Sequence, residues 1–231
     1  MPTLPRHSLV WPDAAGWDRF QAGMAAEATG VRDAVARWRA ADWPLVACRA
    51  AANQPAHEIL LGMPLPPAAD SLLKVRMAAA IDCEQVRHHD AALTLARVLP
   101  AAPAHWRTTL LALQMAASES LPPLQVFGSL AMQSLTGMAY LHPESDIDLL
   151  FHPENLTQLA AGIALLDSFS RALPLDGEVV FADGRAVAWR EWRDVMQAGA
   201  GQPTARVLAK SADGVALVVC QDLLATLGAR R

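Results

Sequence analysis

Two short stretches decide how this chain is interpreted: LQVFGSL at residues 124–130 and SDIDLLF at residues 145–151. Because alternate side chains of a strand point to opposite faces, Asp146 and Asp148 are expected to share one face while their apolar neighbours enter a core. Two carboxylates so close repel each other, and a hard cation such as Mg²⁺ removes that cost by neutralising both. The Gly128-Ser129 turn can bring backbone N–H groups and a hydroxyl near an anion. Carboxylates for Mg²⁺ beside a cradle for phosphate predict a phosphoryl or nucleotidyl transfer site.

The composition of the whole chain is that of a globular protein with a proper core. Its 231 residues are 53% hydrophobic and 18% charged, enough for one large domain or two small ones. A net charge of −4 argues against a nucleic-acid partner, which would require a basic surface. Cys48, Cys83 and Cys220 are odd in number and widely spaced, which favours neither a disulfide framework nor a Cys-based metal site. With no apolar leader and no run of about 20 apolar residues, the chain is expected to be cytoplasmic, without a membrane partner.

The spacing of apolar residues predicts an α+β architecture with two lobes. The first half shows strands at 7–11, 45–49, 58–62 and 72–81, and helices within 13–41 (two, parting at Thr29-Gly30), at 90–99 and at 104–117. The second half shows strands at 124–127 and 146–151, helices at 131–138, after Pro153-Glu154 and at 189–198, and hairpins 178–182/186–188 and 207–210/215–219. Pro122-Pro123 lies where the first half gives way to the second, so the lobes are expected to be residues 1–121 and 122–231.

The order of strand, Gly-Ser turn, helix and Asp-x-Asp strand resembles the nucleotidyltransferase superfamily, which includes DNA polymerase beta. The likeness covers about residues 124–180 and implies that the second lobe is catalytic, with a mixed sheet flanked by helices. The interval from Ser129 to Asp146 is longer than is usual in that superfamily, and an extended loop is expected to hold the excess.

Nucleotidyltransferases usually add a third carboxylate from a later strand, which can help the acceptor lose its proton. Glu178 and Asp176 share a face by the period of two and are both candidates. Glu178 is preferred because Val179 and Phe181 would pack on the other side, whereas Asp176 can simply shape a turn.

Longer strings resemble one particular branch. They are VFGSL (126–130), LTGMAYL (135–141), SDIDLL (145–150), DGEVV (176–180) and GRAVAWREW (184–192), with RHSLVW (6–11), PLV (44–46) and LGMPLP (61–66) upstream. Together they resemble the phosphoribosyl-dephospho-CoA transferases that mature malonate decarboxylase, also called its holo-acyl-carrier-protein synthases. The likeness spans nearly the whole chain. Where the second strand of that family is expected to read Val-Val-Arg-Arg, residues 46–49 read VACR, so a phosphate-binding role for this strand rests on Arg49 alone.

This resemblance implies a Mg²⁺-dependent transfer from a CoA-derived donor, 2′-(5″-triphosphoribosyl)-3′-dephospho-CoA. The acceptor is a serine hydroxyl of the acyl-carrier protein subunit of malonate decarboxylase, and pyrophosphate leaves. Asp146 and Asp148 are then the metal ligands, with Glu178 as the further catalytic carboxylate. Gly128 and Ser129 are assigned to the pyrophosphate-bearing part of the donor.

Three basic residues of the first lobe, Arg49, Lys74 and Arg76, are candidates for the donor's phosphates. Solvation at the surface is the alternative for each, and the lobe as a whole is assigned to substrate or carrier binding. Two other functions stay open. One is nucleotidyl transfer by the same fold to an antibiotic or another protein, and the other is a non-enzymatic binding module with an inert site.

Overall fold

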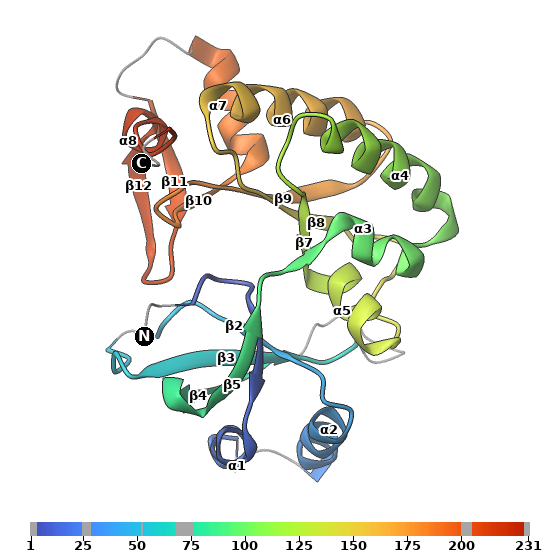
Figure 1. Ribbon diagram of the computed structural model, residues 1–231, viewed down its shortest axis with the longest axis vertical. Helices are drawn as coiled ribbons and strands as arrows, with labels where there is room; N and C mark the ends of the chain where they lie inside the picture. Colours follow the sequence, from blue (N-terminus) through green and yellow to red (C-terminus); the bar gives the residue numbers. More distant parts are fainter. Residues whose placement is uncertain (1–3, 25–28, 52, 68–75, 200–204, 229–231) are drawn as a thin grey trace. The chain divides into compact units, whose positions relative to one another are not determined.

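Figure 1 shows the computed structural model of the chain, which describes residues 4–24, 29–51, 53–67, 76–199 and 205–228. The chain forms two compact units, and each has its own sheet. Residues 1–92 and 138–140 make the first unit, and residues 93–137 and 141–231 make the second. The α+β architecture with two lobes agrees with the sequence. The boundary lies at residue 92 and not at residue 121, because the segment from 93 to 118 pairs and packs with the second unit.

In its described residues, the first unit is a five-stranded antiparallel sheet with two α-helices. Its elements are β1 (Leu9–Pro12), α1 (Ala14–Ala22), α2 (Thr29–Ala40), β2 (Leu45–Ala47), β3 (Glu58–Pro64), β4 (Arg76–Asp82), the 3₁₀ helix η1 (Cys83–Gln85) and β5 (Val86–Asp90). The strand order is β4-β3-β2-β1-β5. Asp13 begins α1, because its side chain accepts a hydrogen bond from the Gly16 N–H at 2.7 Å.

The second unit is a seven-stranded mixed sheet with helices packed against one face. Its elements are β6 (Leu93–Thr94), α3 (Leu95–Val98), the 3₁₀ helix η2 (Leu99–Ala101), α4 (Ala104–Ser118), β7 (Gln125–Phe127), α5 (Gly128–Thr136), β8 (Ile147–Phe151), α6 (Leu156–Phe169), β9 (Leu175–Val180), β10 (Ala186–Ala188), α7 (Trp189–Gly199), β11 (Arg206–Lys210), β12 (Val215–Val219) and α8 (Cys220–Leu224). The strands follow chain order from β6 at one edge to β12 at the other. Of the described pairs in this sheet, β8 and β9 alone run parallel, and α6 is the connection between them.

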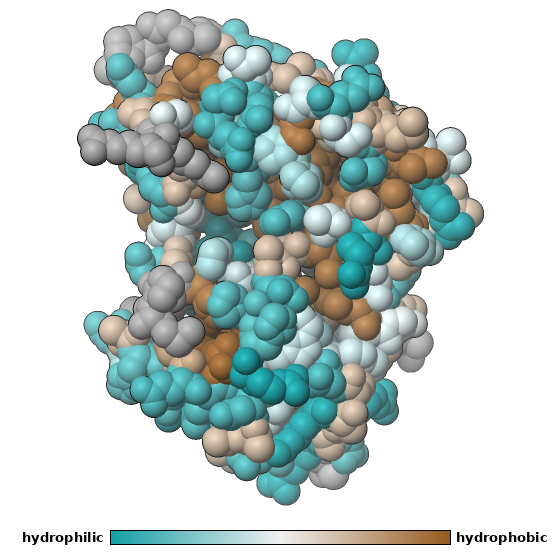
Figure 2. Space-filling view, in the orientation of Figure 1, coloured by the Kyte–Doolittle hydropathy of each residue, from teal (hydrophilic) through white to brown (hydrophobic). Residues whose placement is uncertain are grey.

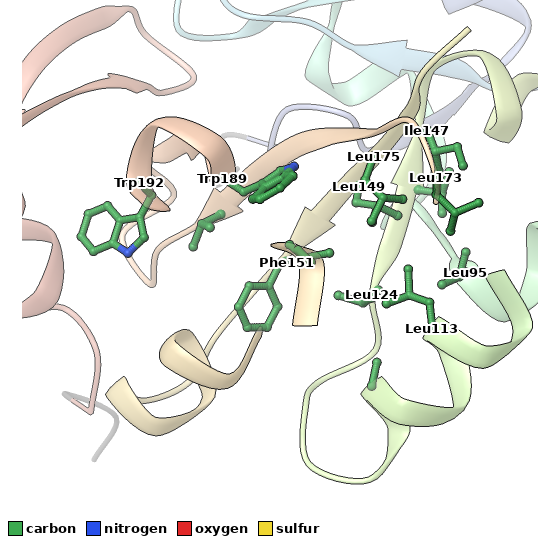
Figure 3. Packing of buried hydrophobic residues seen from close by; sticks show 14 of the residues in the cluster. Leu95, Leu113, Leu124, Ile147, Leu149, Phe151, Leu173, Leu175, Trp189 and Trp192 are labelled. Atoms are coloured by element: carbon green, nitrogen blue, oxygen red, sulfur yellow. The ribbon is translucent and has the colours of Figure 1, made fainter. Parts of the chain in front are cut away.

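Burial divides the second sheet into two faces. Ile147, Leu149 and Phe151 of β8 are at most 1% exposed and belong to the core that the helices share. Figure 3 shows part of this core, to which Leu113 of α4 and Trp192 of α7 also contribute. Because side chains alternate along a strand, the remaining residues of β8 project from the opposite face.

Few large apolar side chains of the described residues are exposed. In Figure 2, hydrophilic residues cover much of the visible face, and hydrophobic residues reach the surface more often over the second unit. The exposed ones lie on α4 (Leu111, Met115), α6 (Leu156), β11 (Leu208) and β12 (Val215, Leu217). Among the described helices, none combines the length and the hydropathy that crossing a membrane would require.

Gly162 tests how tightly α6 packs on the sheet. A Cβ built at this position would lie 2.3 Å from two ring carbons of Phe151. We expect Gly162→Ala to lower the free energy of unfolding by about 1 kcal/mol, because overpacking of about 1–3 kcal/mol exceeds the gain of about 1 kcal/mol in helix propensity. Urea denaturation measures the change. The control Ala161→Gly, at an exposed neighbour in α6, gives the propensity contribution alone. A Gly162→Ala protein more stable than wild type would contradict this packing.

Candidate active site

The Gly-Ser turn joins β7 to α5. Gly128 has a φ of +68°, a conformation that glycine adopts without strain, and it is the first residue of α5. The helix therefore begins at the turn itself and not at residue 131, where the sequence placed its start. Ser129 is 6% exposed. The first turn of a helix carries N–H groups with no partner inside the helix, so α5 offers such groups where β7 ends.

Asp148 lies directly against this turn. Strand β7 pairs with β8 so that Phe127 is opposite Asp148. A Cβ built on Gly128 would lie 2.1 Å from Asp148 Oδ2. The carboxylate therefore occupies the space that a side chain at position 128 would need. Gly128 and Asp148 are 20 residues apart in the chain. The strand pairing nevertheless brings the turn and the Asp-x-Asp strand together at one point of the sheet.

Asp146 immediately precedes β8 and is exposed. The turn before it is closed by two hydrogen bonds: the His142 N–H donates to Ser145 Oγ at 3.0 Å, and the Ser145 N–H donates to the His142 carbonyl at 2.9 Å. After it, the Ile147 N–H donates to the Pro174 carbonyl at 2.8 Å. The backbone is thus held on both sides of Asp146, while its carboxylate stays accessible to solvent.

Strand β9 adds two carboxylates to the face that carries Asp148. Asp176 is the register partner of Asp148, and Glu178 is that of Leu150. Paired residues of neighbouring strands are about 5 Å apart and share a face, so Asp148 and Asp176 are neighbours. Asp176 is exposed, whereas Glu178 is 5% exposed and accepts a hydrogen bond from Lys210 Nζ at 2.9 Å.

Three of these carboxylates are of the type that a hard divalent cation binds, although their oxygens do not all lie within 4.8 Å of one another in the described structure. Asp146, Asp148 and Asp176 offer oxygen ligands, which Mg²⁺ prefers, and adjacent carboxylates favour a cation that neutralises them. The start of α5 offers N–H groups for an anion beside them. The arrangement therefore places candidate metal ligands next to N–H groups that can bind a phosphate. Glu178, the third carboxylate preferred from the sequence, lies two residues beyond Asp176 in β9, on the same face.

The basic residues suggested for the donor's phosphates belong to the first unit. Arg49 is exposed and lies two residues beyond β2. Arg76 is the first residue of β4, and Lys74 lies outside the described residues. Neither Arg49 nor Arg76 belongs to the unit that carries the carboxylates.

Lys210 is a basic residue of the second unit that the sequence reasoning did not select. It is one of two lysines in the chain, and β11 places it beside β10, opposite Ala186. Two features of the sequence could have drawn attention to Lys210: lysine is rare in this chain, and residue 210 lies in a predicted hairpin. His152, which follows β8, supplies little positive charge at neutral pH, because burial lowers the pKa of its imidazole.

The long interval between the Gly-Ser turn and Asp146 has a structural use. Helix α5 ends at Thr136 and is capped by Gly137, which has a φ of +70°. The next three residues, 138–140, belong to the first unit. Tyr140 is 3% exposed, and its hydroxyl donates to the Pro64 carbonyl at 2.9 Å. The extra loop length thus contributes to the first unit.

Two other features of the structure have a simpler explanation than catalysis. His57, Glu58 and Asp82 lie close enough to form a metal site, but Arg19 of α1 forms ion pairs with both carboxylates and holds them to the helix. A groove of about 710 Å³ runs along α6 and α7. These helices pack on the face of the sheet opposite Asp148, so the groove is separate from the carboxylates.

Two family models match the chain one after the other. The model described as the phosphoribosyl-dephospho-CoA transferase MdcG N-terminal domain matches residues 5–92, and the MdcG C-terminal domain matches residues 92–220. The point where one match gives way to the other coincides with the boundary between the two structural units.

Curated proteins named phosphoribosyl-dephospho-CoA transferase are similar over most of the chain. The one from Xanthomonas campestris pv. campestris is 38% identical over 215 residues, which cover 92% of this chain and 93% of the relative. One from Xanthomonas euvesicatoria pv. vesicatoria is 36% identical, over 83% of this chain and 87% of the relative. One from Bradyrhizobium diazoefficiens is 35% identical, over 80% of both. No solved structure gives a significant match.

Gly128 and Gly137 form a matched pair for testing the contact with Asp148. Both have positive φ, but a Cβ at Gly137 would meet nothing within 4 Å. We expect Gly137→Ala to cost about 1–2 kcal/mol of unfolding free energy for backbone strain alone. Gly128→Ala should cost about 1–3 kcal/mol more, because its methyl group displaces the carboxylate. Chemical denaturation measures both, and equal costs would show that Asp148 does not occupy this space.

Proposed function

Because the chain belongs to the phosphoribosyl-dephospho-CoA transferase family and is a transferase, we propose that it completes the acyl-carrier protein subunit of malonate decarboxylase. The group transferred is 2′-(5″-phosphoribosyl)-3′-dephospho-CoA, and its acceptor is a serine hydroxyl. The observation that carries the proposal is the contact of the Gly128 turn with Asp148, beside Asp176 in register.

The proposed reaction is an in-line displacement at phosphorus. The serine oxygen forms a bond to the α-phosphorus of the triphosphoribosyl donor. The bond from that phosphorus to the bridging oxygen breaks, and pyrophosphate leaves with the bonding electrons. The hydroxyl proton passes to a carboxylate of β9. Such a transfer requires positioning and charge neutralisation more than covalent chemistry from the protein.

Each part of the site has a role in this proposal. Asp146, Asp148 and Asp176 would hold Mg²⁺, because they present hard oxygen ligands on one face. When bound, Mg²⁺ would neutralise charge on the phosphates and stabilise the oxygens of the displacement. The N–H groups at the start of α5, with Gly128 and Ser129, would bind the pyrophosphate-bearing part of the donor.

We also propose that the second unit has the nucleotidyltransferase fold, on the order of its elements. A strand, a Gly-Ser turn, a helix and an Asp-x-Asp strand follow in order, and a parallel strand with further carboxylates comes next. The first unit is proposed to bind the donor or the carrier, with Arg49, Lys74 and Arg76 as the phosphate-binding candidates.

The function can be tested by mass spectrometry of the loaded carrier. We expect the purified enzyme, incubated with donor, Mg²⁺ and apo-carrier, to add the mass of the arm to one serine. Removal of Mg²⁺ with EDTA should abolish the transfer. Asp148→Asn should slow it at least about 100-fold, because a metal ligand is lost. Asp194→Asn, at an exposed position on α7, is the control and should load the carrier at the wild-type rate.

Two outcomes would contradict the proposal, the first its metal site and the second its function. One is loading by Asp148→Asn as fast as by wild type, which would remove the proposed metal site. The other is transfer of a nucleotide from ATP or CTP to another substrate with no transfer of the CoA-derived arm, which would establish a different nucleotidyltransferase.

The third carboxylate can be assigned by comparing Asp176→Asn with Glu178→Gln. The register places Asp176 beside Asp148, whereas Glu178 is paired with Lys210. We therefore expect Asp176→Asn to lower kcat at least about 100-fold and to raise the Mg²⁺ concentration for half-maximal rate about 10-fold. Glu178→Gln should leave the Mg²⁺ dependence near that of wild type and cost about 1 kcal/mol of stability. The reverse pattern would assign the role to Glu178, as the sequence alone suggested.

A further inference from the structure

The hairpin of β11 and β12 exposes three large apolar side chains. Leu208, Val215 and Leu217 are 41%, 45% and 62% exposed, and we call them the hairpin patch. Leu208 and Leu217 are direct cross-strand partners, and Val215 is the partner of Lys210. Since 208 and 210 are two residues apart on β11, all three side chains of the patch project from one face of the sheet.

That face is the one that carries the carboxylates. Lys210 pairs with Ala186 of β10, and Ala186 pairs with Val180 of β9. Val180 shares its face with Glu178, and Lys210 Nζ reaches Glu178 Oε1 at 2.9 Å. The hairpin patch therefore begins beside Lys210, which contacts Glu178 of β9, and continues to the edge of the sheet.

The edge strand itself lacks the usual protection against pairing. β12 is the last strand in the sheet order, at the edge of the unit seen in Figure 1. Residues 214–220 read GVALVVC, with no charge and no proline. Soluble proteins commonly place charges or proline on such edges, and exposed apolar surface at an edge marks a site of association.

We propose that the hairpin patch is the surface on which the acceptor protein docks, an inference that rests on the proposed function. The acceptor must bring a serine to Asp148, and β12 is four strand spacings, roughly 19 Å, away from β8. A protein interface of about 800 Å² per partner is roughly 30 Å across. An interface of this diameter that includes Asp148 can therefore extend along the sheet as far as the hairpin.

The charge beside the patch that can meet an acidic acceptor is that of Arg206, because Lys210 is already paired with Glu178. Arg206 is exposed and lies two residues before Leu208 on the same face of β11. Lys210 lies two residues after it. The acceptor's contact surface is thus expected to be apolar at its centre, with carboxylates at the rim that meet Arg206.

The test is steady-state loading of the apo-carrier by the full-length enzyme carrying Leu217→Asp. We expect the KM for the carrier to rise at least 10-fold, while kcat and the KM for the donor stay within 2-fold of wild type. Arg206→Glu should raise the KM for the carrier several-fold and serves as a second variant of the same surface. Met115→Asp is the matched control, because Met115 is 63% exposed on α4, on the helical side of the sheet, and it should change nothing.

Each alternative result identifies a specific failure. An unchanged KM for the carrier in both hairpin variants, with normal loading by wild type, overturns the docking surface and leaves the proposed function standing. The same is true if the variants instead raise the KM for the donor, or if they only convert a dimer to a monomer in light scattering. A wild-type enzyme that loads no carrier overturns the proposed function and this inference together.

Discussion

The close approach of Gly128 to the Asp148 carboxylate is the constraint on which the second unit depends. It exists because β7 and β8 pair with Phe127 opposite Asp148, so the turn after β7 passes directly over the carboxylate. Any side chain at position 128 would collide with it. A slip of one residue in this pairing would move the Asp148 carboxylate to the helical face. The buried residues Ile147, Leu149 and Phe151 prevent such a slip, because they must remain in the core.

The parallel pairing of β8 with β9 extends the same arrangement to a third acidic side chain. A Cβ at Gly177 would lie 1.9 Å from the Leu149 carbonyl oxygen, so β9 approaches β8 as closely as it does only because position 177 is glycine. That approach brings Asp176 beside Asp148 and Glu178 beside Leu150. Asp176, which the sequence alone suggests could simply shape a turn, is therefore the neighbour of Asp148 in the Asp-x-Asp strand.

The sequence predicts the second unit well because its signals are local. Alternation in residues 146–151, the helical spacing after Pro153-Glu154 and the two hairpins are each visible in a short window, and the structure confirms them. Strand β5, with the sequence VRHHD, shows no apolar alternation and is defined by its pairing with β1 about 80 residues away, so it was missed. The boundary at residue 92 was missed for the same reason, since β6 belongs with β7 by pairing alone. The position of Asp176 opposite Asp148, and that of Lys210 at Glu178, depend on strand pairings that no local pattern specifies.

The two faces of the second sheet separate the apolar core from the proposed site. One face is closed by α4, α6 and α7, and its burial of apolar side chains offsets the cost of gathering carboxylates on the other. Glu178, the most buried of these acids, is also the one that Lys210 neutralises. In the proposed function, a donor and a protein acceptor would both approach the strand face, because the helices pack on the other. The strand face runs from β6 at one edge of the sheet to the exposed hairpin at the other, so the strand pairing that brings the carboxylates together also sets the surface available to the proposed substrates.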